Sequence, residues 1–170
     1  MIAPTLRTPR LSLRAHRLDD FEDYARMWAD PAVCRHIGGK VRTREESWIR
    51  FLRHFGMWQV VGYGFWAIEE KATGLFLGEA GFMRRDAAPA DPEAGWALLP
   101  EAHGRGFATE ALAAILAWGD RHLDGRKQVC IIEPGNAASL RVAAKCGFEP
   151  AGSAIKDGRT ISVFERITAL

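Results

Sequence analysis

Residues 93–111, EAGWALLPEAHGRGFATEA, contain the feature that decides the fold. The apolar first half is typical of a strand, and the apolar residues after Gly106 recur with the spacing of a long helix. Gly104 and Gly106 form a turn between the two, so that backbone N–H groups gather at the positive end of a helix, where a phosphate can bind. The lysine of a Walker loop and the third glycine of a dinucleotide-binding motif are both missing. A plain strand-to-helix connection without a ligand would show the same residues.

The sequence before this turn predicts two helices and an antiparallel meander of strands. The first helix is expected to begin near residue 19 and to stop at Asp30-Pro31, and the second runs from a capping box at Thr43 to near Gly56. The apolar residues on one face of the second helix are Trp48, Phe51, Leu52 and Phe55. Strand patterns cover residues 10–14, 64–69, 75–82 and 93–99, and the last three form the meander.

The sequence after the turn switches to a strand, helix, strand crossover. The helix is expected from Gly106 to His122, and the apolar run at 129–132 suits a buried strand. Asn136 caps a short helix that Gly147 closes, and residues 160–167 are the last predicted strand. These elements predict a mixed α/β (α+β) domain built on one sheet.

Composition indicates one globular domain over residues 1–170. Hydrophobic residues make up 48% and charged residues 26% of the chain, which excludes disorder. The three cysteines lack the spacing of a disulfide framework or a zinc site, so we expect reduced thiols, a cytoplasmic location and no metal. No apolar run approaches the roughly 20 residues of a membrane span, and a net charge of +2 gives no strong field for nucleic acid. We therefore expect neither a membrane nor a nucleic acid as a partner.

A second segment, residues 136–148 (NAASLRVAAKCGF), stands further along the chain. Together with the turn it resembles the GNAT family of acetyl-CoA-dependent N-acetyltransferases. The family's acetyl-CoA motif, Gln/Arg-x-x-Gly-x-Gly/Ala, is matched by residues 103–108 (HGRGFA), and Gly147-Phe148 closes the second segment. The branch that contains the Rim-type ribosomal-protein N-terminal acetyltransferases is resembled by residues 8–14 (TPRLSLR), 28–31 (WADP), 64–68 (GFWAI) and 77–82 (LGEAGF). The resemblance covers nearly the whole chain.

The resemblance implies a mostly antiparallel central sheet of about six to seven strands flanked by about four helices. It also implies direct attack of a neutral primary amine on the thioester of acetyl-CoA, with Glu93 as general base, usually through water. The acceptor would be a protein N-terminal α-amine or a small molecule such as an aminoglycoside, a polyamine or an amino acid. The implied cofactor-binding residues are Ala97, Leu98 and Leu99 along pantetheine, His103, Gly104, Arg105, Gly106, Phe107, Ala108 and Thr109 at the pyrophosphate, and Asn136 and Ser139 at the thiol.

Two positions depart from the family's pattern. His103 replaces the first Gln/Arg of the motif, which leaves the backbone amides to bind the phosphates, and Ala143 stands where many members have a general-acid tyrosine. Ser139 is then the remaining candidate to protonate or stabilise the leaving thiolate. Glu79, on the neighbouring strand, is assigned a structural or substrate-orienting role ahead of a catalytic one.

Each of these site residues also has a plain structural interpretation. Glu93 would be a strand-end carboxylate or an ion-pair partner, Asn136 a helix N-cap and Ser139 a residue of the first helical turn. A non-catalytic CoA-binding sensor or scaffold of this fold is the alternative function, whereas phosphoryl transfer lacks its lysine and its Mg²⁺ carboxylates. The expected assembly is a monomer or a homodimer.

Overall fold

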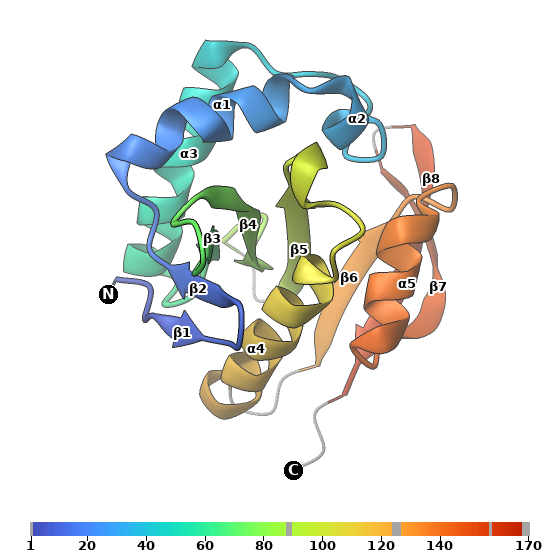
Figure 1. Cartoon of the computed structure of the whole chain (residues 1–170). Helices are drawn as coiled ribbons and strands as arrows, with labels where there is room; N and C mark the ends of the chain where they lie inside the picture. The colour runs from blue at the N-terminus through green and yellow to red at the C-terminus, as the bar shows by residue number, and fades with distance from the viewer. Residues whose placement is uncertain (1, 88–89, 124–126, 157, 168–170) are drawn as a thin grey trace.

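The sheet is the frame of the molecule, and a computed structural model describes it over residues 2–87, 90–123, 127–156 and 158–167. Within these residues eight strands lie in the order β1-β2-β3-β4-β5-β6-β8-β7 (Figure 1). Their bounds are β1 Leu6–Arg7, β2 Leu11–Arg14, β3 Phe65–Glu70, β4 Phe76–Met83, β5 Glu93–Leu98, β6 Gln128–Ile132, β7 Glu149–Lys156 and β8 Arg159–Arg166. Every neighbouring pair is antiparallel except β5 and β6. The predicted mixed, mostly antiparallel sheet is confirmed.

The expected strand number was slightly low, because two of the eight strands give little signal in the sequence. Strand β1 has two residues, too few to show an alternation of apolar and polar side chains. Strand β7 is exposed along almost its whole length, so neither of its faces is marked by apolar residues.

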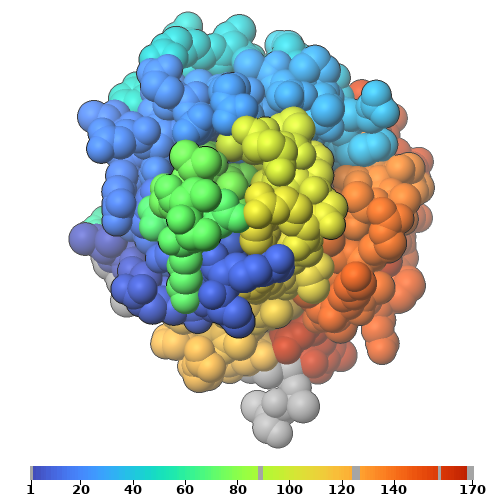
Figure 2. Space-filling view, viewed as in Figure 1, coloured from blue at the N-terminus to red at the C-terminus, as the bar shows by residue number. Residues whose placement is uncertain are grey.

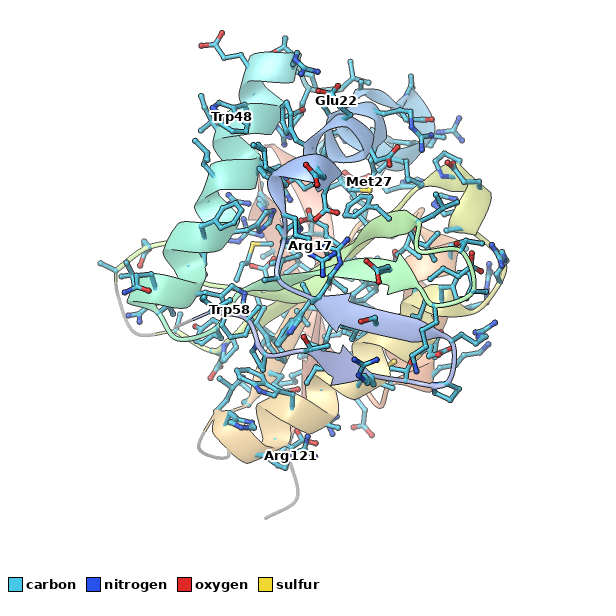
Figure 3. The ribbon with its side chains drawn as sticks, turned by 60° about the vertical axis from the view of Figure 1, so that its left-hand side comes forward. Arg17, Glu22, Met27, Trp48, Trp58 and Arg121 are labelled. Carbon is cyan, nitrogen blue, oxygen red and sulfur yellow. The ribbon has the colours of Figure 1, made fainter. Side chains whose placement is uncertain are left out.

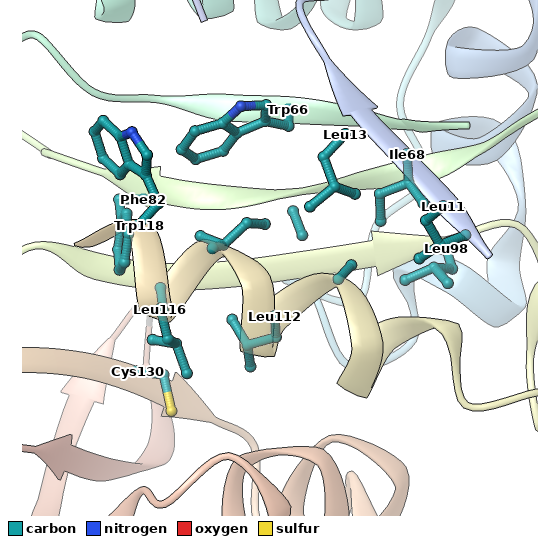
Figure 4. Close-up of a cluster of buried hydrophobic side chains, with 14 of the residues drawn as sticks. Leu11, Leu13, Trp66, Ile68, Phe82, Leu98, Leu112, Leu116, Trp118 and Cys130 are labelled. Atoms are coloured by element: carbon teal, nitrogen blue, oxygen red, sulfur yellow. The ribbon is translucent and has the colours of Figure 1, made fainter. Parts of the chain in front are cut away.

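Helices cover both faces of the sheet. Their bounds are α1 Phe21–Ala29, α2 Pro31–Cys34, α3 Arg44–Val60, α4 Phe107–His122 and α5 Ala137–Lys145, with short 3₁₀ turns at Leu18–Asp20 and Pro100–Ala102. Helix α4 packs on one face, where Leu112 and Leu116 meet Leu13, Ile68 and Phe82 of the strands (Figure 4). Helices α1 and α3 bury a second apolar cluster on the other face. No helix of the described residues is long and apolar enough to cross a membrane.

Helix α3 differs from its prediction in length and in its buried side. It continues through Gly56 to Val60, because one glycine inside a helix costs only about 1 kcal/mol and tertiary contacts can offset that. Its buried residues are Ser47, Phe51, His54 and Trp58. Trp48, Leu52 and Phe55 are 37%, 47% and 46% exposed, so the predicted face was wrong by part of a turn. Figure 3 shows Trp48 and Trp58 near opposite ends of this helix.

Strands β5 and β6 touch at one position and then separate. Their parallel pairing consists of Glu93 opposite Val129, after which β6 pairs onward with β8 only. Helix α4 provides the connection between the two strands. The space that opens beyond this pair, called the wedge below, lies in the middle of the sheet and positions the site.

Candidate active site

The loop before α4 presents a row of backbone N–H groups. Gly104 and Gly106 have φ angles of 73° and 80°, a left-handed conformation that glycine adopts without steric cost. The first helical hydrogen bond runs from Glu110 N to Gly106 O at 3.1 Å, and the Gly106 cap has no side-chain hydrogen bond. Among the described residues, the amides of 104–109 have no backbone carbonyl as acceptor. Such a concave set of donors at a helix N-terminus binds anions such as phosphate.

Two arginines flank this loop. The guanidinium carbons of Arg10 and Arg105 lie 4.5 and 4.4 Å from the ring centre of Phe107, which is buried. Arg10 also binds the Arg105 carbonyl at 2.9 Å and pairs with Glu110 at 2.7 Å. Figure 2 shows the loop, in yellow, on the surface beside the green turn that follows β3. Arg10 was not predicted as a site residue, because it reaches the loop from the start of the chain.

The wedge contains a cleft of about 410 Å³ that is lined by β5, β6, α3 and α5. Leu99 N donates to Leu77 O at 2.9 Å, so the amide of Leu99 is engaged by the chain beside it. Because backbone groups alternate in direction along a strand, those of Trp96 and Leu98 point away from β4, into the wedge. His103 Nε2 lies 2.8 Å from the Leu98 carbonyl, which places that imidazole at the end of the same strand. Of the three residues predicted along pantetheine, Leu98 is thus the one whose backbone faces the wedge.

Asn136 and Ser139 line the cleft from the first turn of α5. The Asn136 side-chain oxygen accepts a hydrogen bond from Ser139 N at 3.1 Å, so Asn136 is the predicted helix cap. Gly147, with a φ of 81°, follows the end of this helix as predicted. Capping orders the turn that presents the Ser139 hydroxyl to the wedge.

Glu93 lines the same cleft where β5 and β6 meet. Arg85 Nε donates to Glu93 Oε2 at 2.6 Å, and a second guanidinium nitrogen binds the other oxygen. The Glu93 side chain is 13% exposed and Arg85 is 47% exposed. The structural interpretation of Glu93 as an ion-pair partner is therefore correct, and its role as general base stays a prediction.

A buried polar cluster lies beneath the cleft and was not predicted as a unit. Glu79 Oε2 is 2.7 Å from His54 Nε2 and 3.7 Å from His16 Nε2, and Glu79 Oε1 is 3.5 Å from Arg50. Burial alone would raise the pKa of Glu79, but the nearby His54 and Arg50 outweigh it and lower the pKa to about 2. Burial also lowers the pKa of His16 to about 3, so this ring is neutral at pH 7. Glu79 is therefore a buried anion that contacts both His54 and Arg50.

The atoms of His16, His54 and Glu79 that could bind a metal all lie within 4.8 Å of one another. The two imidazole rings, however, stack with an interplanar angle of 7° and centres 4.4 Å apart. A metal ion lies in the plane of each imidazole it binds, about 2.0–2.1 Å from the nitrogen. One ion cannot lie in two nearly parallel planes that are a ring thickness apart. We interpret the cluster as a buried counter-charge that positions Arg50. The expected absence of a metal stays a prediction.

The comparisons with known proteins decide the family. A profile described as the acetyltransferase (GNAT) domain matches residues 10–149. The chain belongs to the GNAT acetyltransferase family. The Bacillus subtilis protein YkkB is 32% identical over 164 residues, which covers 94% of this chain and 93% of YkkB. As a GNAT member, the protein is an acetyl-CoA-dependent acyltransferase.

Solved structures agree with this GNAT fold. An acetyltransferase from Agrobacterium tumefaciens is 30% identical with a TM-score of 0.86, and the match covers 98% of this chain and 95% of that one. RimL, a ribosomal L7/L12 α-N-protein acetyltransferase solved with coenzyme A, has a TM-score of 0.81 at 19% identity over 96% of this chain and 98% of RimL. At that identity RimL shows the fold alone.

Proposed function

We propose that this GNAT enzyme transfers the acetyl group of acetyl-CoA to a primary amine by direct attack. The observation that carries the proposal is the row of amides at 104–109, which have no backbone carbonyl as acceptor among the described residues and which follow the strand that separates from β6. A long cofactor with an anionic diphosphate and a neutral pantetheine arm fits a site with donors at one end and a separated strand at the other. The N–H of Leu98, whose carbonyl lies beside His103, would donate to the pantetheine arm, and donors along β5 would polarise the thioester carbonyl.

Ser139 is proposed to act on the leaving group. Its hydroxyl is presented to the cleft by the capped first turn of α5, and a hydroxyl can donate a proton to a thiolate as negative charge develops. Ala143 has no proton to give at the position of the family's tyrosine. Cys130 offers no alternative nucleophile, because burial raises the pKa of its thiol to about 12. We further propose that the three cysteines, none of which is in a disulfide, reflect a cytoplasmic location.

Acetyl-CoA turnover with a panel of amines tests the function. We expect acceptor-dependent release of free CoA together with an acetylated amine of matching amount, followed by thiol titration and mass spectrometry. The panel holds amino acids, polyamines, an aminoglycoside and peptides with free N-termini. Tight CoA binding without turnover for any amine would instead favour the non-catalytic CoA-binding sensor.

Glu93→Gln is expected to lower activity most at pH values below the pKa of the acceptor. An amine must be neutral to attack, and α-amines titrate near 7.7–8.0, so at lower pH a base must remove the proton. We expect a loss of about tenfold or more there, since general bases contribute about 10²–10⁴-fold, and a smaller loss as pH rises. The measurement is kcat/KM from pH 6 to about 9.5 for both enzymes.

A defect of equal size across this pH range would mean that Glu93 orients the acceptor through a hydrogen bond. Arg85→Gln is the matched control, because it removes the partner of Glu93 and keeps the carboxylate. If Glu93 is the base, the Arg85 variant keeps a pH profile of the wild-type shape. No defect at any pH in Glu93→Gln would remove this residue from the site.

A further inference from the structure

The cleft carries more positive charge than the protein as a whole. Its cationic lining residues among those described are Arg42, Arg50, Arg53, Arg85, Lys156 and Arg159. Its carboxylates are Glu79, Glu93 and Glu133. Six cations and three carboxylates give the cleft a formal charge of +3, whereas the whole chain has a net charge of +2. A charge surplus this concentrated favours an anionic ligand.

Ion pairs account for part of this charge. Arg85 is paired with Glu93, and Arg159 lies 2.9 Å from Glu133. Apart from Lys156 on β7, the cations outside these two pairs lie on α3 and in the segment before it.

Two arginines of this region lie over the ring of Trp28, and a third, Arg53, lines the same cleft. The guanidinium carbons of Arg50 and Arg42 are 4.0 and 5.8 Å from the centre of the indole ring. The Nε atoms of both arginines are buried without a hydrogen bond, and Arg50 has only the contact of 3.5 Å to Glu79 as an ion pair. Arg53 forms no ion pair with the described residues, and burial together with the nearby Arg50 lowers its pKa. Within this arginine group, Glu79 balances the charge of Arg50, but the two Nε donors have no acceptor and the charges of Arg42 and Arg53 have no ion-pair partner among the described residues.

Coenzyme A does not account for the arginine group under the proposed function. The loop at 103–109, where the diphosphate would bind, offers its own row of backbone amides, and none of its residues lines the cleft. The pantetheine arm and the acetyl group that would reach the cleft are uncharged. The unused positive charge therefore belongs to the acceptor side.

We propose that the acceptor is a small amine that carries a carboxylate on the same molecule, as an α-amino acid does. This inference rests on the proposed function and names its substrate class. The planar guanidinium fork binds a carboxylate with two parallel hydrogen bonds, and stacking on Trp28 keeps that fork oriented. A volume of about 410 Å³ that is shared with the thioester arm suits a single amino acid. A polyamine would bring further positive charge to the arginine group.

The test compares amino acids with their own carboxamides. Glycine, alanine, methionine, phenylalanine and glutamate are each offered beside the corresponding amide, and kcat/KM is measured at pH 8. The free carboxylate raises the pKa of the neighbouring amine, so the carboxamide has more neutral amine at the same pH. A preference for the acid must then come from binding. We expect at least one acid to exceed its amide by about tenfold or more, as a charged hydrogen bond of about 1.5–3 kcal/mol implies.

Arg53→Gln and Arg42→Gln are expected to raise KM for that acid by about tenfold and to change KM for its amide by less than about twofold. Arg121→Gln is the matched control and keeps the selectivity of the wild type. Arg121 is exposed at the far end of α4, away from the cleft (Figure 3).

Three results would overturn the inference. These are an equal or better use of every carboxamide, a preference for polyamines, and a preference for long acidic peptides over every free amino acid. If no amine is acetylated, the proposed function fails, and calorimetry of the same amino acids with CoA-saturated protein decides the inference separately. Binding that Arg53→Gln weakens would support the anion site, and no binding would overturn it.

Discussion

A Gly106→Val enzyme is expected to show no rise in melting temperature with CoA, whereas the wild type rises by several degrees. A ligand at about 100 times its Kd stabilises a folded protein by about 2.7 kcal/mol, which corresponds to about 5–10 °C for a domain of this size. Gly106 has a φ of 80°, and a β-branched residue held there is strained by about 1–3 kcal/mol. Relief of that strain would rotate the amides that are proposed to bind the diphosphate. The added Cβ would also lie 3.5 Å from the Arg10 guanidinium.

Gly56→Ala is the matched control for this loss. Gly56 lies inside α3 with no atom within 4 Å of an added Cβ, so alanine fits and removes a flexible residue from the helix. We expect the full CoA shift, with the melting temperature of the free protein unchanged or slightly higher. Differential scanning fluorimetry with CoA and with ATP measures both variants, and ATP is expected to do little. An undiminished CoA shift in Gly106→Val would place the cofactor elsewhere.

Glu79→Gln is expected to lower the free energy of unfolding by about 3 kcal/mol at pH 7. The carboxylate is fully buried, and its charge balances Arg50 and contacts His54. A neutral amide would leave the Arg50 charge without a counter-ion in a site of low dielectric constant. For a domain of this length the melting temperature would fall by about 6–12 °C. Denaturation in urea and thermal unfolding both measure the loss.

The pH dependence of that loss has a definite sign. The pKa of Glu79 is lowered from 4.5 to about 2, so its stabilisation is complete above pH 4.5 and disappears as pH falls toward 2. The gap between wild type and Glu79→Gln should therefore shrink between pH 4.5 and pH 3. Glu93→Gln is the control, because its partner Arg85 is 47% exposed and a solvent-screened ion pair is worth about 0–1 kcal/mol. A loss below about 1 kcal/mol for Glu79→Gln, or a gap that is constant with pH, would contradict this account.

The sequence allowed prediction of the parts of the fold that are coded locally. The strand and helix around Gly104 and Gly106 lie within one continuous stretch, where the apolar pattern indicated the strand and the two glycines indicated the loop. Helix α3 shows where local pattern fails. Two sets of residues on this helix recur with helical spacing. Packing against α1 and the sheet buries the set that contains His54 and leaves much of the more apolar set exposed.

The candidate site was likewise predictable only where residues close together in the sequence form it. The amide row and the Asn136 cap could be predicted because backbone conformation and short spacing produce them. The Glu79 cluster could not, since its partners come from α3 and from the segment after β2. One histidine and several arginines among the apolar residues of α3 were a signal of it, but only the fold shows which carboxylate they meet.

The separation of β5 from β6 places an unpaired strand border inside the molecule. Unpaired borders at the outside of a sheet invite the strands of other proteins and so promote aggregation. Here the walls of the cleft enclose the border in a volume of about 410 Å³, too small for a strand of another folded protein. Hydrogen-bonding groups thus stay available to a slender extended ligand while they are shielded from self-association. The fold can therefore bind an extended ligand along a strand without exposing that strand to aggregation.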